Sequence, residues 1–158
     1  MADRIQSPAR RLTGKLKATK ARDIMTKKVI TTRSDKTLAD ITRIISRERI
    51  SGLPVLNKKK MIEGIVTTKD LFLVMDMITS GSVIEDDMRE AANPSVKFAM
   101  SSNVVNIKKT TSLDDIIDIM STHNIHTLPV VEKKKIVGIV GKRDVLRAFY
   151  EAVADLDT

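Results

Sequence analysis

Residues 50–55 read Ile-Ser-Gly-Leu-Pro-Val, and residues 64–70 read Gly-Ile-Val-Thr-Thr-Lys-Asp. Both segments return later, as Ile-His-Thr-Leu-Pro-Val at 125–130 and Gly-Ile-Val-Gly-Lys-Arg-Asp at 138–144. The offset is 75 residues for the first pair, as it is from Met25 to Met100, and 74 for the second. Such a repeat indicates two copies of one supersecondary unit. A copy of about 55 residues is too small to bury a satisfactory core alone, so the copies are expected to pack on each other.

The first half of each copy predicts a strand followed by a helix. The β-branched runs at 29–32 and 104–107 favour strands. Thr37-x-x-Asp40 and Ser112-x-x-Asp115 then have the spacing of a capping box, and apolar residues follow at helical intervals.

The second half of each copy predicts a hairpin followed by a helix. Apolar strands flank the turns at Lys58–Lys60 and Lys133–Lys135, and the closing helices are expected near 70–78 and 144–154. We expect the two lysine runs to be solvated turn tips. The predicted fold class is α/β (α+β), with two β-α-β-β-α repeats packed with pseudo-twofold symmetry.

Charge and composition set the outer boundaries. The chain has 158 residues and a net charge of +8, and residues 1–22 hold seven basic residues against one acidic residue. This composition predicts a basic, disordered arm, either a solvated tail, a docking segment for nucleic acid or an acidic membrane surface, or a cleaved targeting peptide. Repeat 1 is then expected at 23–78, a partly helical connecting segment at 79–97 and repeat 2 at 98–154.

Several classes of function are disfavoured. Cysteine is absent and both histidines lie in one short stretch, so we predict no catalytic residues and no metal site. No glycine-rich phosphate loop or nucleophile elbow is present, and the chain is not expected to be an enzyme. No apolar run approaches the roughly 18 residues of a membrane span, and no secretory signal is visible, so a soluble cytoplasmic protein is predicted. Aromatic residues make up only 3%, too few for a base-stacking surface.

With the repeat established, the sequence resembles a tandem pair of cystathionine beta-synthase (CBS) domains, the Bateman module. The resemblance rests on the duplicated 50–55 and 64–70 motifs and covers nearly the whole chain after residue 22. It implies a regulatory module that binds an adenosine-containing ligand, of the AMP, ADP, ATP, NAD or S-adenosylmethionine class, in clefts between the repeats. It also implies a homodimer that signals to an unknown effector protein through changes in packing, with no catalytic cofactor.

The resemblance assigns candidate ligand residues. Asp70 and Asp144 take the role of holding the ribose hydroxyls, and Thr67 that of touching phosphate or ribose. Thr67 and Asp70 also have capping-box spacing, and one pair of residues can do both. The remaining candidates line the same clefts by family position or lie near the Asp motifs: Thr31, Gly52, Lys69, Asn106, His126, Thr127, Lys142 and Arg143.

The second copy departs from the pattern because Gly141 stands where the first copy has Thr67. A lost hydrogen bond predicts weaker binding at that site, although a glycine could instead allow close approach of a ligand. Two other functions stay open: a nucleic-acid-associated protein that uses the basic arm, and a purely structural dimerisation module with vestigial clefts.

Overall fold

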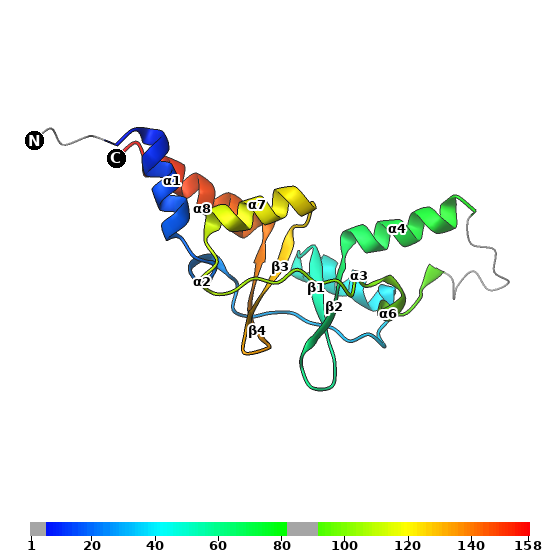
Figure 1. Ribbon diagram of the computed structural model, residues 1–158. Coiled ribbons are helices and arrows are strands. Elements are labelled where there is room, and N and C mark those ends of the chain that lie inside the picture. Colours follow the sequence, from blue (N-terminus) through cyan, green and yellow to red (C-terminus); the bar gives the residue numbers. More distant parts are fainter. Residues whose placement is uncertain (1–5, 82–91) are drawn as a thin grey trace, which may run out of the picture. The chain divides into compact units, whose positions relative to one another are not determined.

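The computed structural model describes residues 6–81 and 92–158, shown in colour in Figure 1. The chain divides into two compact units, one made of residues up to 29 together with 106–158, and the other of residues 30–105. The segment that precedes each repeat therefore packs with the other repeat. The acidic part of the predicted connecting segment, which contains Met88, lies outside the described residues.

The 30–105 unit confirms the predicted order of helix, hairpin and helix. Its elements are α3 (Leu38–Glu48), β1 (Gly52–Leu56), β2 (Ile62–Thr67), α4 (Thr68–Thr79) and α6 (Val96–Ala99). The Thr37 backbone N–H and hydroxyl both donate to Asp40 Oδ2, so the predicted capping box begins α3. Strands β1 and β2 pair antiparallel, with Gly52 opposite Thr67.

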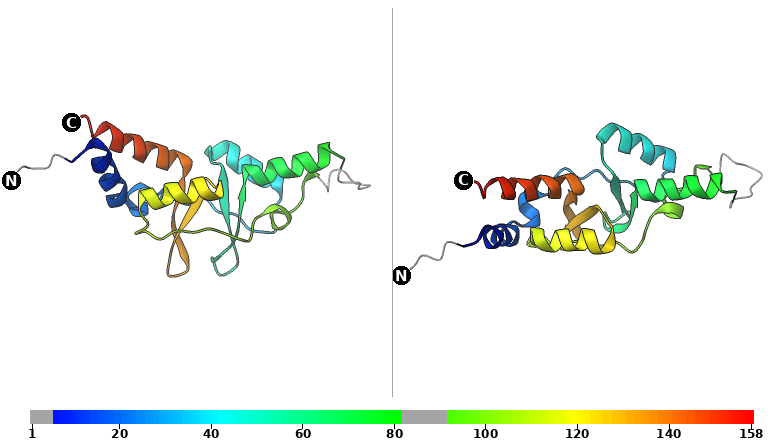
Figure 2. Two further views of the ribbon diagram at one scale, coloured as in Figure 1. Left: turned by 45° about the horizontal axis from the view of Figure 1, so that its top comes forward. Right: turned by 90° about the horizontal axis from the view of Figure 1, so that it is seen from above.

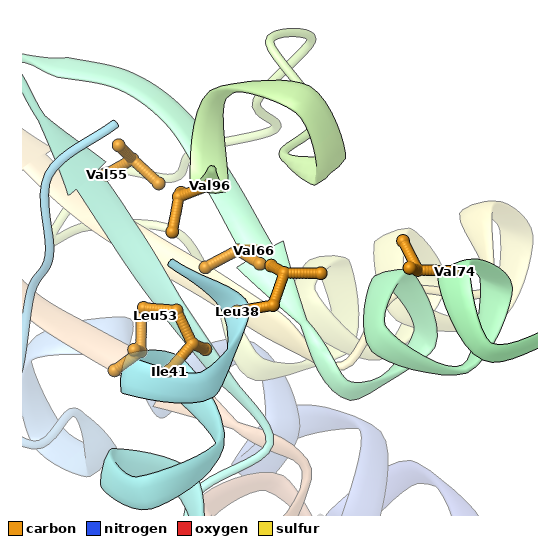
Figure 3. Packing of buried hydrophobic residues seen from close by; sticks show 7 residues of the cluster. All are labelled: Leu38, Ile41, Leu53, Val55, Val66, Val74 and Val96. Atoms are coloured by element: carbon orange, nitrogen blue, oxygen red, sulfur yellow. The ribbon is translucent and has the colours of Figure 1, made fainter. Parts of the chain in front are cut away.

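A small apolar core holds this unit together. Seven buried side chains from α3, β1, β2, α4 and α6 meet in it (Figure 3): Leu38, Ile41, Leu53, Val55, Val66, Val74 and Val96. Full burial of a side chain of this kind stabilises the fold by about 1.5–3 kcal/mol. The short helix α6 contributes Val96, so the segment before repeat 2 completes the core of repeat 1.

The other unit has the same plan with one additional helix, α1, because α2 stands where the first unit has α6. Its elements are α1 (Pro8–Ala18), α2 (Ala21–Ile24), α7 (Leu113–His123), β3 (Thr127–Glu132), β4 (Lys135–Gly141) and α8 (Lys142–Ala154). Helix α1 contacts both α7 and α8 (Figure 2). Six of its buried residues stand at the positions of first-core residues, with Ala21 in the place of Val96, whereas Val74 has no buried counterpart: Ala21, Leu113, Ile116, Leu128, Val130 and Val140.

The prediction of a disordered arm is wrong for residues 8–22. Ser7 Oγ accepts from the Arg10 backbone N–H and Pro8 occupies the first turn, so α1 has a well-formed start. Leu12 and Leu16 lie one turn apart, so they share one face, and both are half-buried. The arm's low average hydrophobicity concealed this short apolar stripe.

Two basic side chains of the arm bind to other parts of the same unit. The Arg11 guanidinium donates to the Leu156 carbonyl oxygen at 2.9 Å, and Lys15 Nζ lies 3.2 Å from an Asp155 carboxylate oxygen. Part of the arm's charge therefore fastens α1 to the end of α8.

The first predicted strand of each repeat is reduced to one bridging residue. Thr32 bridges Val55 and Ile107 bridges Val130, both in parallel, and residues 29–31 and 104–106 form no strand. The Thr32 N–H donates to the Pro54 carbonyl, and the preceding bond of a parallel ladder would need a donor at Pro54 itself. Proline has no N–H, so Pro54 and its counterpart Pro129 end the ladder.

The predicted capping box at Ser112 and Asp115 does not form. The Ser112 hydroxyl instead donates to Asp114, because this carboxylate is one residue nearer. That hydrogen bond lowers the pKa of Asp114 below its usual value.

Two methionines close the units against glycines. A Cβ added at Gly64 would lie 2.6 Å from the Met100 Sδ atom, and one at Gly138 would overlap the Met25 side chain. Ser101 and Thr26, the residues after these methionines, bridge Ile65 and Ile139 at the outer edge of β2 and β4. Within 6–81 and 92–158, no helix is long and apolar enough to cross a membrane.

Candidate functional site

The junction between β2 and α4 holds the first predicted pair. Strand β2 ends at Thr67 and helix α4 begins at the next residue. Asp70 Oδ2 accepts from the Thr67 backbone N–H at 2.7 Å and from its hydroxyl at 3.2 Å. The carboxylate is thus held in one orientation, while its Oδ1 atom accepts no hydrogen bond within the described part of the chain.

The junction between β4 and α8 repeats this arrangement with one difference. Asp144 Oδ2 accepts from the Gly141 backbone N–H at 2.8 Å, and glycine offers no hydroxyl. Asp144 Oδ1 likewise has no partner among the described residues. Each unit therefore presents one half-buried carboxylate beside the N-terminus of a helix of twelve or more residues.

The neighbouring candidates follow from the strand register. Gly52 lies opposite Thr67, and Thr127 lies opposite Gly141. Gly52 is buried and Thr127 is half-buried, whereas the His126 side chain is exposed.

Other candidates lie beside these groups. Thr31 precedes the residue that bridges β1, and Asn106 precedes the residue that bridges β3. Lys69, Lys142 and Arg143 are exposed in the first turns of α4 and α8.

The structure thus places the candidates in two equivalent groups, one in each unit. The 30–105 unit holds Thr31, Gly52, Thr67, Lys69 and Asp70. The other unit holds Asn106, His126, Thr127, Gly141, Lys142, Arg143 and Asp144.

Sequence reasoning missed the carbonyl groups that fasten the two helices. The Thr68 backbone N–H donates to the Ser51 carbonyl at 2.9 Å, and the Lys142 N–H donates to the His126 carbonyl at 3.1 Å. Both acceptors precede the Gly-Leu-Pro-Val and Thr-Leu-Pro-Val strands. The repeat offset of 75 residues could have identified them as equivalent positions.

The glycine at 141 is not required by local crowding. An added Cβ would lie 3.7 Å from Asp144 Oδ2 and 3.9 Å from the His126 carbonyl oxygen, both ordinary contact distances. The φ of Gly141 is −103°, which any residue can adopt. The chain's own packing therefore leaves room for a Cβ here.

The described residues contain no group of three or more His, Asp or Glu side chains that could hold a metal ion.

Comparison with known proteins agrees with the internal repeat. The CBS domain family model matches residues 21–76 and 95–151. An uncharacterized protein of Methanocaldococcus jannaschii is 31% identical over 150 residues, covering 80% of this chain and 89% of the relative. Inosine-5'-monophosphate dehydrogenase of the same archaeon is 28% identical over 129 residues, and this match spans 81% of the chain but only 23% of the enzyme.

A solved structure has the same fold over nearly its whole length. The CBS domain pair of protein MJ0100, crystallised in complex with 5-methylthioadenosine and S-adenosyl-L-methionine, superposes with a TM-score of 0.70 at 25% identity. The match covers 84% of this chain and 97% of that one. The chain therefore belongs to the CBS domain family and contains two tandem copies of the domain.

Proposed function

We propose that this chain is a regulatory module that binds an adenosine-containing ligand at the two strand-to-helix junctions. The observation that carries the proposal is the oriented aspartate of each unit, Asp70 or Asp144, which keeps one carboxylate oxygen free of partners within the described residues. A carboxylate accepts hydrogen bonds only, so it is suited to the two vicinal hydroxyls of a ribose.

The surroundings of these carboxylates suit the rest of a nucleotide. Backbone N–H groups at a helix N-terminus attract anions such as phosphate. Lys69, Lys142 and Arg143 are exposed nearby and add positive charge. The relative MJ0100, which is bound to two adenosine compounds, supports the same ligand class.

The two sites are expected to differ in affinity. Thr67 supplies a hydroxyl and Gly141 does not, and a hydrogen bond of this kind contributes about 0.5–1.5 kcal/mol, or up to about 3 kcal/mol to a charged group. The site with Asp144 should therefore bind several-fold to a hundredfold more weakly. Isothermal titration calorimetry that gives two equal affinities would reject this inequality.

Thermal melts test the ligand class directly. The panel is AMP, ADP, ATP, NAD, S-adenosylmethionine and 5′-methylthioadenosine. A ligand at a hundredfold excess over its Kd stabilises the folded state by about 2.7 kcal/mol. Asp70→Asn should remove most of the shift. Asp76→Asn is the matched control because Asp76 is an exposed carboxylate on the same helix.

The control defines the contrary outcomes. If both variants reduce the shift equally, Asp70 is not the ligand residue. If no compound moves the melt at millimolar concentration, the module is a structural dimerisation unit with vestigial clefts. Catalysis is not part of this proposal, because the match to the dehydrogenase is confined to 23% of that enzyme.

A module of this kind signals by a change in how its subunits pack together, and we propose that the signalling form is a homodimer. Large apolar side chains are exposed on α4 and α8: Phe72, Leu73, Met75, Leu146 and Tyr150. A bound ligand shifts the population of arrangements only as far as its affinity differs between them. Phe72→Ser should lower the molecular mass measured by light scattering. Phe98→Ser, on α6, is the control and should leave that mass unchanged. A monomeric wild-type chain would contradict the dimer.

A further inference from the structure

The fold gathers lysines from three separate parts of the sequence at one end of the β3–β4 hairpin. The turn itself carries Lys133 and Lys134, and Lys135 begins β4. Ile107 bridges Val130 beside β3, and Lys108 and Lys109 follow it. On the other side, Thr26 bridges Ile139, and Lys27 and Lys28 follow at the outer edge of β4. We call these seven residues the lysine edge.

The position of Lys109 ties the flanking segment to the turn. Its Nζ atom lies 3.0 Å from Glu132, the last residue of β3, and its carbonyl accepts from the Arg22 backbone N–H. Figure 2 shows this turn projecting beyond the strands on the side away from α7 and α8.

Most of this charge is uncompensated. Glu132 pairs with Lys109, and the other six lysines form no ion pair within residues 6–81 and 92–158. All six are exposed. The unit that contains them has 17 basic and 10 acidic residues in the sequence, a net charge of +7, whereas the 30–105 unit has 11 and 10, a net charge of +1.

The first repeat supplies an internal comparison. At the positions equivalent to Lys27 and Lys28 it has Ser102 and Asn103, and at that of Lys109 it has Ser34. Arg33, at the position of Lys108, pairs with Asp35 at 3.6 Å. The lysines at 133–135 have counterparts at 58–60, so the flanking lysines are what distinguishes this hairpin from the one in the first repeat.

Two lysines of the β3–β4 turn adopt a backbone conformation that is unfavourable for residues with a side chain. Lys133 and Lys134 have φ of 50° and 65°, the left-handed region that hairpin turns of this kind normally fill with Asn-Gly. The equivalent turn in the first repeat has one such residue, Lys60. Two adjacent lysines at strained positions favour a role for their charge over a role in the turn.

We propose that the lysine edge is a docking surface for the phosphate backbone of a nucleic acid. Clustered, unpaired cations on neighbouring segments match the closely spaced phosphates of a duplex. The large hydrophobic residues exposed in the described part of the chain lie on α4, α6 and α8 and none lies on the β3–β4 hairpin, which favours sequence-independent binding to a backbone over a membrane. This surface is separate from the adenosine sites and does not depend on the proposed function.

The test is fluorescence anisotropy with a short labelled DNA duplex over a salt series from ~50 to ~200 mM. Each lysine that contacts a phosphate contributes about −0.9 to the slope of log K against log salt. The variant Lys133→Asn with Lys134→Gly should reduce the slope by about 1.8 and weaken binding at least ~10-fold at low salt. Because Asn-Gly suits the turn, the same variant should also raise Tm by a few degrees.

The matched control is Lys59→Gln with Lys60→Gly, which removes two lysines from the other hairpin turn and should leave binding nearly unchanged. Arg10→Gln with Lys17→Gln tests α1 in the same way. The proposal is overturned if either control weakens binding as much as the lysine-edge variant. It is also overturned if no duplex binds at ~50 mM salt, or if the protein binds phosphatidylserine vesicles and not the duplex.

Discussion

Replacing Gly141 by threonine should give the second repeat the same strand-to-helix junction as the first. The backbone angles already agree, with φ and ψ of −103° and 171° at Gly141 and −127° and 168° at Thr67. The distances from an added Cβ to its nearest neighbours, 3.7 and 3.9 Å, are ordinary contact distances, and the first repeat already holds a threonine at this position. The new hydroxyl can then donate to Asp144 Oδ2, as the Thr67 hydroxyl does to Asp70 Oδ2.

The expected gain in the free energy of unfolding has two parts. The hydrogen bond contributes about 0.5–1.5 kcal/mol. Removing a glycine from a position that needs no special φ contributes about 0.4–1 kcal/mol, because the unfolded chain loses conformations. Together these give about 1–2.5 kcal/mol, or a rise in Tm of roughly 2–10 °C for a chain of this size.

The assay is urea unfolding followed by circular dichroism, with calorimetric titration of S-adenosylmethionine on the same samples. Thr67→Gly is the mirror-image control and should destabilise the protein by a similar amount. Gly141→Thr should also bring the two ligand affinities closer together. A loss of stability in Gly141→Thr would refute the inference that the junction accommodates a side chain. Unchanged unequal affinities would refute the role assigned to the hydroxyl.

Three further predictions concern stability. Gly64→Ala should lower the free energy of unfolding by about 1–3 kcal/mol, because the new Cβ meets the Ser101 carbonyl at 3.0 Å as well as Met100. Gly138→Ala should lower it less, because only the flexible Met25 side chain must move. Urea melts that rank the two variants in the reverse order would contradict this. Leu16→Asn should release α1 from α7 and α8, and hydrogen exchange of the backbone amides of residues 8–18 should become faster. Unchanged protection of these amides would show that Leu16 does not hold the helix. The Ser112 hydroxyl holds the pKa of Asp114 below its ordinary value of 3.8, so the ionised Asp114 stabilises the fold above that pH and this stabilisation is lost as the pH falls. Ser112→Ala should therefore raise the pH midpoint of acid unfolding. A midpoint that stays the same or falls would contradict the assignment.

The repeat, the hairpins and the starts of α3 and α7 were predictable at residue level because their signals are local. The Thr37 and Thr67 capping boxes, the lysine turns and the apolar spacing of α3 and α7 involve residues only a few positions apart. Helices α4 and α8 each begin two residues before the predicted start, because Asp70 and Asp144 accept from the backbone N–H three residues earlier.

Other features depended on partners far away in the sequence. Helix α1 was missed because two leucines do not form a core by themselves, and only α7 and α8 supply the surface that they cover. The predicted first strands are too long because the β-branched runs do not show which residues they will pair with. Their partners are Pro54 and Pro129, which have no backbone N–H to donate. The predicted capping box of α7 does not form because the Ser112 hydroxyl donates to Asp114 instead.

The sequence by itself determined the family, the duplication and the pair of aspartates at the strand-to-helix junctions, since each follows from short-range pattern and its recurrence. Only the tertiary structure decided which segment completes which repeat. Residues 20–28 and 95–101 pack on the sheet of the other copy, where Met25 and Met100 cover Gly138 and Gly64. That exchange brings Lys27 and Lys28 to the β4 edge of a hairpin more than 100 residues away in the chain, because backbone pairing and burial act on proximity in space and not in sequence.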